Sequence, residues 1–367
     1  MGLGQSAMEN LVVSREFWRG KRVFMTGHTG FKGGWLALWL SELGAEVHGF
    51  ALAPPTEPNL FTVLKLSDHL AHSTIADIRD AAALTEAMQV ARPDVVLHLA
   101  AQPLVRHSYT APEETYAVNV MGTVNLFEAV RQTPGVKAVV NITTDKCYEN
   151  REWIWPYREN EALGGFDPYS SSKACSELVT SAYRSSFLAA AGVQLASARA
   201  GNVIGGGDWA ADRLVPDFLR ALDAGQTLTI RSPQATRPWQ HVLEPLSGYL
   251  ALAEKLFLDG QDFAEAWNFG PDESDARPVQ WIVERLCSRI PEARWQCDMS
   301  PQPHEAHTLK LDISKSRTRL GWRPRWDLDT ALLMTLEWHQ AWRQESDMAT
   351  FSLNQIQKHE AAAASPV

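Results

Sequence analysis

The chain has 367 residues, of which 45% are hydrophobic and 21% charged, and its formal net charge at pH 7 is −9. This acidic balance argues against a general nucleic-acid-binding protein, which usually carries a basic face. No run of about 18 apolar residues is present, so no membrane span is expected. The length predicts two domains, or one large domain with insertions.

The N-terminal segment, residues 1–20, mixes charged and apolar residues and lacks the features of a signal peptide. We interpret it as a short leader before the first strand. The four cysteines, at positions 147, 175, 287 and 297, form no C-x-x-C pair. Neither a zinc site nor a disulfide framework is therefore predicted, and we expect free thiols, no metal and a cytoplasmic protein.

A glycine-rich turn follows the first predicted strand, Val23 to Met25. Gly27, Gly30 and Gly33 fall at three-residue intervals, and an apolar helical run begins directly after them. In a dinucleotide site, the first glycine allows the tight turn, the second lets the backbone approach a pyrophosphate, and the third lets the helix pack on the strand. The alternative is an ordinary turn before a core helix. Three other residues complete the predicted cofactor loop: Thr29, Phe31 and Lys32.

The second predicted strand, Ala45 to Leu52, ends without an acidic residue. A NAD site usually places Asp or Glu here to bind the ribose 2′-hydroxyl, whereas a NADP site accommodates the 2′-phosphate with a basic residue. Ala51, Leu52 and Ala53 occupy the place instead. Local chemistry therefore leaves the choice between NAD and NADP open.

Three further strands are predicted, over residues 73–78, 94–99 and 138–143. Helical segments separate them, and the longest, Glu113 to Gln132, contains Asn119. This alternation predicts an α/β fold: a Rossmann-like, doubly wound parallel sheet with helices on both faces. Ligands bind such sheets beyond the carboxyl ends of the strands. The residues that we expect to border the cofactor there are Asp77, Ile78, Leu99, Ala100 and Ala101.

Tyr169 and Lys173 are four residues apart at the start of another predicted helix, so they share one face. A tyrosine with an unperturbed pKa of about 10 is a poor base at neutral pH. A nearby ammonium lowers that pKa, so Lys173 would let Tyr169 take a proton from a sugar hydroxyl, with Thr144 alongside. The alternative is an exposed tyrosine and a solvated lysine.

The C-terminal part contains a glycine-rich loop from Asn202 to Trp209, followed by Arg213, Arg231, Arg237 and His241. Cations near such a loop suit a diphosphate, although surface salt bridging is the alternative. We expect a NAD-binding domain over residues 21–204 plus about 240–270. A smaller, mixed α/β substrate domain would span residues 205–239 plus 271–344. The tail, residues 345–367, is expected to have little order and to be mobile.

These motifs resemble those of the extended short-chain dehydrogenase/reductase family, and within it those of the CDP-glucose 4,6-dehydratases. The resemblance runs from about Arg22 to Trp342. The broad motifs are the glycine turn and Tyr169-x-x-x-Lys173. The narrower strings are Gly27-His28-Thr29-Gly30-Phe31-Lys32-Gly33-Gly34-Trp35, Thr144-Asp145-Lys146-Cys147-Tyr148, Gly205-Gly206-Gly207-Asp208-Trp209, Arg237-Pro238-Trp239-Gln240-His241 and His304-Glu305-Ala306.

The resemblance implies NAD as cofactor and a CDP-sugar as substrate, in deoxysugar synthesis of the lipopolysaccharide O-antigen type. It implies that Asp77 and Ile78 border the adenine and that Asn119 belongs to the cofactor site. The implied substrate contacts are Gln102, Asn202, Arg213, Arg237, His241 and His304. It also implies pairing of two subunits through helices beside the sheet, in a homodimer or a dimer of dimers.

The implied reaction is dehydration of the sugar at C5 and C6. Tyr169, helped by Thr144 and Lys173, removes the O4 proton while the C4 hydride passes to NAD. Asp145, kept protonated by burial, then protonates the departing C6 hydroxyl. The related dTDP-glucose dehydratases carry Glu as the C5 base where this chain has Lys146. Either a neutral Lys146 is the base here, or a charged Lys146 stabilises the enolate while another group or a water takes the proton.

Three other functions compete with this interpretation. A UDP-N-acetylhexosamine 4,6-dehydratase also pairs Asp with Lys. A sugar-nucleotide 4-epimerase shares the Tyr-Lys pair but has no use for Asp145-Lys146 as an acid and a base. A non-catalytic NAD(P)-sensing module needs the glycine turn but not the Tyr-Lys pair.

Overall fold

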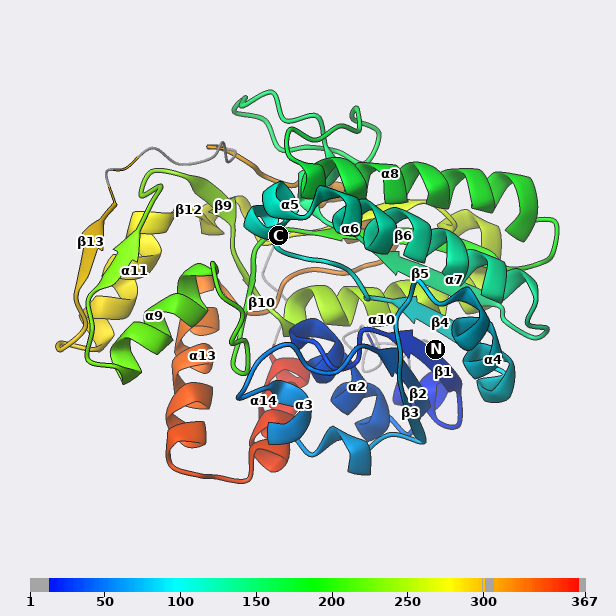
Figure 1. Cartoon of the computed structure of the whole chain (residues 1–367), viewed down its shortest axis with the longest axis horizontal. Coiled ribbons are helices and arrows are strands. Elements are labelled where there is room, and N and C mark those ends of the chain that lie inside the picture. Colours follow the sequence, from blue (N-terminus) through cyan, green and yellow to red (C-terminus); the bar gives the residue numbers. More distant parts are fainter. Residues whose placement is uncertain (1–12, 299, 301–306, 363–367) are drawn as a thin grey trace, which may run out of the picture.

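The computed structural model describes residues 13–298, 300 and 307–362. Its centre is a sheet of seven parallel strands in the order β11-β6-β5-β4-β1-β2-β3 (Figure 1). The strands are β1 (Arg22–Thr26), β2 (Glu46–Ala51), β3 (His72–Ile75), β4 (Val95–His98), β5 (Ala138–Ile142), β6 (Gln194–Ala200) and β11 (Ala266–Phe269). The order reverses between β1 and β4, as in a Rossmann sheet. The predicted fold class is therefore confirmed.

Helices cover both faces of this sheet (Figure 1). One face carries α2 (Phe31–Glu42) and α10 (Leu243–Asp259), and the other carries α4 (Ala81–Ala91), α7 (Gly122–Arg131) and α8 (Pro168–Tyr183). Strand side chains alternate between the faces, so Val23 and Met25 join the core with α2 and α10 while Phe24 joins the core with α4 and α7. Burial on both faces explains why the inner strands β1, β4 and β5 are mainly apolar, whereas the edge strand β3 is partly exposed and polar.

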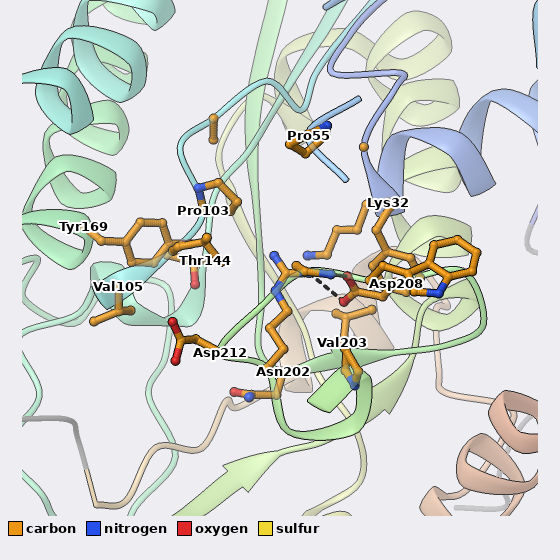
Figure 2. A pocket seen from close by; sticks show the side chains of 18 of the residues that line it. Lys32, Pro55, Pro103, Val105, Thr144, Tyr169, Asn202, Val203, Asp208 and Asp212 are labelled. Carbon is orange, nitrogen blue, oxygen red and sulfur yellow. Dashed lines mark hydrogen bonds and ion pairs between the residues drawn. The ribbon is translucent and has the colours of Figure 1, made fainter. Parts of the chain in front are cut away.

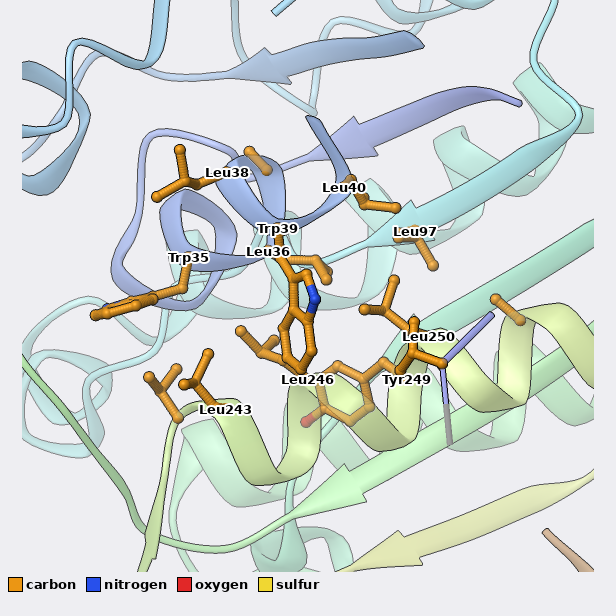
Figure 3. Packing of buried hydrophobic residues seen from close by; sticks show 14 of the residues in the cluster. Trp35, Leu36, Leu38, Trp39, Leu40, Leu97, Leu243, Leu246, Tyr249 and Leu250 are labelled. Atoms are coloured by element: carbon orange, nitrogen blue, oxygen red, sulfur yellow. The ribbon is translucent and has the colours of Figure 1, made fainter. Parts of the chain in front are cut away.

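The packing of α2 on α10 fixes the helix that begins at the glycine turn. Figure 3 shows Trp39 and Leu36 of α2 facing Leu246, Tyr249 and Leu250 of α10. Trp35 is fully buried and donates its indole N–H to the carbonyl oxygen of Gly206, at 2.9 Å. The start of α2 is therefore anchored by a large core rather than by surface contacts.

A second region lies beyond the carboxyl ends of the strands. Its core joins helices and strands from residues 204–332. The elements around it are β7 (Val203–Ile204), α9 (Leu214–Asp223), β8 (Leu228–Ile230), β9 (Thr236–Pro238), β10 (Gln240–His241), β12 (Ala276–Pro278), α11 (Val279–Arg289), β13 (Trp295–Cys297) and α13 (Leu328–Arg343). The small sheets pair β10 with β7, β12 with β9 and β13 with β8. The exact domain boundaries stay a prediction.

The remaining helices are short or terminal. They are α1 (Arg15–Trp18), α3 (Leu60–Val63), α5 (Val105–Thr110), α6 (Pro112–Tyr116), α12 (Ser314–Arg319) and α14 (Met348–Ala361). The long helix predicted from Glu113 is interrupted by a π-helical turn, Ala117–Met121, between α6 and α7. Within the described part of the chain, no helix combines the length and apolarity that crossing a membrane requires.

Both chain ends differ from expectation where the structure describes them. The predicted leader lies outside the described residues up to residue 12, but Trp18 of α1 is fully buried. The prediction of a mobile tail is wrong for residues 348–361, which form α14. Asp347 caps this helix and Ile356 is fully buried. The order of α14 comes from packing on α2 and α13, which local sequence does not reveal.

Candidate active site

A pocket of about 630 Å³ opens between the sheet and the second region. Its walls are the glycine turn after β1, the segments that follow β4, β5 and β6, and the cation-bearing segments of the second region (Figure 2). The predicted site residues that line it are Gly27, Thr29, Gly30, Phe31, Lys32, Gly33, Asp77, Ile78, Leu99, Ala100, Ala101, Thr144, Asp145, Lys146, Tyr169, Lys173, Asn202, Arg213 and Arg237. Their individual roles stay predictions.

The glycine turn has the geometry of a dinucleotide cradle. Gly27 has φ +78°, and a Cβ there would lie 2.8 Å from the backbone nitrogen of Ala100. A Cβ on Gly33 would lie 2.0 Å from the Gly27 carbonyl oxygen. Gly30 is the N-cap of α2 and makes no side-chain cap, so the first N–H groups of the helix are available to an anion. The cradle fits the pyrophosphate of a dinucleotide.

The wall formed by β2 and β3 is mostly small and apolar. The Thr29 hydroxyl donates to the carbonyl oxygen of Leu52 at 2.8 Å, which ties the glycine turn to the end of β2. Asp77 accepts from Arg79 at 2.6 Å, and this bond holds the pKa of the Asp77 carboxyl below its usual value. Asp77 and Ile78 line the pocket here, as expected of residues beside an adenine.

Tyr169 and Lys173 are brought to the pocket by the start of α8. The Asp167 side chain caps this helix by accepting from the N–H of Ser170 at 2.9 Å, and Pro168 occupies the first turn. Tyr169 makes a side-chain hydrogen bond with Thr144, and Figure 2 shows the two side chains pointing toward one another. The Lys173 ammonium donates to the carbonyl oxygen of Ile142 at 3.5 Å.

The pKa of Tyr169 corrects one expectation. Burial raises it to about 12, while the bond with Thr144 and the positive charge of Arg213 act in the lowering direction. The net shift is therefore upward, opposite to the lowering that was expected from Lys173. Burial lowers the pKa of Lys173 itself to about 8. Arg213, a cation that acts to lower the pKa of the phenol, comes from the substrate side of the pocket.

Asp145 has the environment of a proton donor. Burial is the main influence on its carboxyl group and raises its pKa. Oδ1 accepts from the Thr144 hydroxyl at 3.0 Å, and buried Oδ2 has no hydrogen-bond partner among the described residues. Lys146 follows in a short helical turn, Asp145–Cys147, and also lines the pocket.

Lys32 places a second buried amine in the pocket. Its side chain runs from the first turn of α2 toward the centre of the site (Figure 2). Burial lowers its pKa to about 8, the charges of Arg213 and Lys173 add to this effect, and Asp145 opposes it. The Lys32 amine therefore interacts electrostatically with groups on both the cofactor side and the substrate side of the pocket.

The opposite wall holds cations that are paired with carboxylates of the chain. Arg213 bonds to Asp208 at 2.8 Å, and Arg231 bonds to Asp212 at 2.8 Å. Arg106 approaches Asp212 at 3.5 Å. Asp212 has φ +61°, a left-handed conformation that is uncommon for residues other than glycine. Sequence reasoning named Arg231 among the cations that suit a diphosphate but did not select Arg106, Asp208 or Asp212; of these, only Asp208 was signalled, by the Gly205–Trp209 string.

Three of the predicted site residues that the structure describes do not line the pocket: Gln102, Asn119 and His241. The Asn119 side chain instead accepts from the backbone N–H of Gln102 and donates to the carbonyl oxygen of Gln102 and to the Ser172 hydroxyl. The Gln102 side chain bonds to the backbone of Leu104 and to Thr115. Both amides therefore help to shape the segment after β4, and their predicted contacts with cofactor and substrate stay predictions.

His241, predicted as a substrate contact, does not line the pocket either. It is fully buried, and its ring lies 6.2 Å from that of Trp35 and 4.9 Å from that of Trp326. Burial holds the pKa of its imidazole well below the usual value. It therefore packs in the core behind the pocket. His304 lies outside the described residues.

Comparison with known proteins agrees with this site. A family model described as GDP-mannose 4,6 dehydratase matches residues 24–335. The CDP-glucose 4,6-dehydratase of Salmonella typhimurium is 54% identical over 357 residues, which are 96% of this chain and 99% of that protein.

Two solved structures share the fold. The DesIV dTDP-glucose 4,6-dehydratase double mutant from Streptomyces venezuelae, with NAD and DAU bound, has a TM-score of 0.73 at 23% identity, over 89% of this chain and 99% of that chain. A UDP-glucose-4-epimerase from Stenotrophomonas maltophila, with NAD and formylated UDP-arabinopyranose, has a TM-score of 0.76 at 20% identity, over 89% and 100%. Because dehydratase and epimerase match almost equally, the fold alone does not separate these activities.

The doubly wound sheet, the glycine turn and the Tyr169–Lys173 pair define an extended short-chain dehydrogenase/reductase. More narrowly, the chain belongs to the GDP-mannose 4,6 dehydratase family, whose model spans most of its length. The predicted resemblance is confirmed, including the likeness to a CDP-glucose 4,6-dehydratase.

Proposed function

We propose that the chain converts CDP-D-glucose to CDP-4-dehydro-6-deoxy-D-glucose and water, with NAD as a resident cofactor. The observation that carries the proposal is the meeting of Tyr169, Asp145 and the glycine turn in one pocket. The 54% identity to a CDP-glucose 4,6-dehydratase supports the choice of nucleotide. An epimerase would need Tyr169 but would have no use for a buried acid beside Lys146.

The cofactor would be held by the glycine turn and by the small residues after β4. Gly27 and Gly33 leave no room for a side chain there, which is what close approach of a pyrophosphate requires. When bound, NAD supplies an acceptor for the hydride of the sugar C4 and a donor of that hydride to C6. The fold supplies the cradle, and the protons are moved by side chains.

Tyr169 is positioned to remove the proton of the sugar O4. Burial raises the pKa of Tyr169 to about 12, and its hydrogen bond with Thr144 and the charge of Arg213 offset part of that rise in favour of the phenolate, the form that a general base needs. Since Arg213 lies on the substrate side, binding of a diphosphate would partly neutralise this cation. Lys173 would then be the nearest remaining cation on α8.

Asp145 and Lys146 would carry out the elimination. The new C4 ketone acidifies the C5 hydrogen, and Lys146, or a group that it orients, removes this proton. Burial raises the pKa of the Asp145 carboxyl, which favours its protonated form, and its Oδ2 has no hydrogen-bond partner among the described residues, so Asp145 would protonate the C6 hydroxyl as water leaves. A buried carboxylic acid with a raised pKa is suited to this donor role at neutral pH.

The direct test is to incubate the purified protein with CDP-glucose and NAD and to assay for a 4-keto sugar. Substrate deuterated at C4 should give product deuterated at C6, and the absence of label at C6 would rule out the scheme. A panel that includes UDP-N-acetylglucosamine and UDP-glucose separates the two kinds of dehydratase and the 4-epimerase. Lack of turnover on every nucleotide sugar would favour a sensing module.

We also propose a cytoplasmic homodimer, with a dimer of dimers as the larger assembly. All four cysteines are free thiols, which is usual in a reducing compartment. Tyr116, Met121 and Leu178 are exposed apolar side chains on two adjacent helical segments beside the sheet. Sedimentation velocity of the wild type and of Leu178→Asp tests whether these helices pair, and an unchanged mass would contradict it.

A further inference from the structure

A buried ion pair lies behind the active site and has no role in the chemistry proposed above. Glu177 of α8 and Arg199 of β6 bond at 2.8 Å, and each side chain is only 3% exposed. Desolvating two charges is costly, so such a pair is weak evidence for stability. Its place is informative, because Glu177 lies one helical turn after Lys173 and two turns after Tyr169.

Glu177 connects α8 to the segment that leads from the end of β5 to Thr144. Its carboxylate accepts from the hydroxyl of Thr143 at 2.5 Å and from that of Ser197 at 2.6 Å, in addition to Arg199. Thr143 directly precedes Thr144, and Lys173 donates to the carbonyl oxygen just before it in the chain. The carboxylate therefore fixes how α8 sits against the end of β5, and with it how Tyr169 faces Thr144.

Arg199 extends the same connection to the segment that carries Asp145 and Lys146. Its guanidinium donates to the Tyr148 hydroxyl at 2.9 Å and to the Glu159 carbonyl oxygen at 3.1 Å. The Tyr148 hydroxyl in turn donates to Asn268 of β11 at 2.7 Å. One ion pair thus anchors the two segments that hold the proposed base and the proposed acid.

The charges around Lys173 come from several elements. Glu177 on its own helix is the strongest influence in favour of its ammonium form, followed by Cys147 in the turn after β5. Lys32 of α2 and His98 of β4 also interact with Lys173 electrostatically. Arg199 and Arg184 interact with Glu177 but are not among the groups that influence Lys173.

We propose that Glu177 is a positioning residue that holds the Lys173 ammonium in its charged form and in register with Tyr169, while Arg199 keeps Glu177 ionised and in place. Glu177 touches neither pocket nor substrate; it acts through Lys173 and Thr143. Its kinetic effect rests on the proposed function, whereas its effect on Lys173 does not.

The test follows the titration of Lys173 in two ways. First, the ε-carbon resonance of Lys173 is titrated by NMR in the protein without substrate and is assigned with Lys173→Arg. Second, the pH profile of kcat on CDP-glucose is measured. In Glu177→Gln the resonance and the alkaline limb of kcat should both move to lower pH by about one unit, since a nearby opposite charge is lost. In the conservative variant Glu177→Asp, the alkaline limb of the kcat profile should stay at its wild-type pH.

Two further variants separate charge from structure. Ser197→Ala removes a hydrogen bond to the same carboxylate but no charge, so both titrations should stay at their wild-type positions. Glu177→Gln with Arg199→Gln removes both charges and leaves no unpaired buried ion. This double variant should show the same downward shift even if the single variant does not fold.

The inference is overturned if Lys173 titrates as in the wild type in the double variant, or if Ser197→Ala shifts it equally. Failure of the proposed function has a different signature. In that case no variant or wild type turns over CDP-glucose, but the NMR titration still reports on Glu177.

Discussion

The two walls of the pocket are built in different ways. The cofactor wall consists of backbone and small residues, with Gly27 and Gly33 packed so closely that a Cβ would meet main-chain atoms. The substrate wall consists of long charged side chains, in which Arg213 and Arg231 are neutralised by Asp208 and Asp212. The first wall has a fixed shape, whereas we expect the cations of the second to exchange their carboxylate partners for a ligand diphosphate.

This difference determines how each wall should respond to substitution. A backbone wall tolerates no added atoms, because close-packed main chain does not move aside. A wall of ion pairs is adjustable, because partly exposed pairs contribute only about 0–1 kcal/mol each. Between the two walls lie Asp145 and Lys146, where a substitution should change the chemistry rather than the shape.

The largest effect is expected for Gly33→Ala. Its Cβ would lie 2.0 Å from the Gly27 carbonyl oxygen, so we expect a loss of about 3 kcal/mol in the free energy of unfolding and no measurable NAD binding. Gly30→Ala is the matched control, because its nearest contact is 3.4 Å. It should unfold like the wild type while binding NAD more weakly. Denaturation and calorimetric titration check both; a Gly33→Ala protein of wild-type stability would contradict the rigid wall.

Lys146→Met should break the elimination and leave the preceding oxidation measurable. We expect exchange of the C5 hydrogen with solvent to fall by about a hundredfold, the scale of one general base. Transient absorbance at 340 nm follows oxidation, and deuterium uptake at C5 follows exchange. Exchange at the wild-type rate would remove Lys146 from the elimination step.

Asp145→Asn should lower the activity and raise the stability of the folded chain. Burial raises the pKa of the Asp145 carboxyl in the folded state. At pH values above the pKa that this carboxyl has in the unfolded chain, its ionisation therefore favours the unfolded chain. The wild type therefore loses stability as the pH rises through about 4 and above, and the amide avoids this loss. At pH 7 we expect the variant to gain about 1 kcal/mol in unfolding free energy while kcat falls about a hundredfold.

Urea denaturation of Asp145→Asn and wild type at pH 7 and at pH 4 checks the sign. The advantage of the variant should shrink at the lower pH. Equal stabilities at both pH values would mean that Asp145 is not held neutral by the fold, and the acid would have to be sought elsewhere.

The site features that the sequence predicts also divide between the two walls. The glycine turn and the Tyr169–Lys173 pair were recognisable because their function depends on local spacing. Gln102, Asn119 and His241 do not line the pocket, and spacing alone did not reveal that the two amides bond within the chain or that the imidazole packs against Trp35 and Trp326. Asp212 was missed, and with it the pairing of Arg231, because an ion pair between loops has no local pattern. The helix α14 forms because it buries Ile356 and its neighbours, not because its sequence is strongly helical.

The smallest effect should come from Asp212→Asn. Asp212 holds Arg231 at 2.8 Å and Arg106 at 3.5 Å, at side-chain exposures of 29–42%. If the carboxylate competes with the substrate diphosphate for these guanidinium groups, removing its charge should lower KM for CDP-glucose by about two- to fivefold, the worth of an exposed ion pair. Because this gain applies equally to substrate and transition state, kcat should stay unchanged. Arg231→Gln should raise KM instead, and the two effects should shrink together in about 1 M salt. A rise in KM for Asp212→Asn would mean that the carboxylate orders the substrate wall rather than competing with the ligand, and the two walls would then be equally preformed.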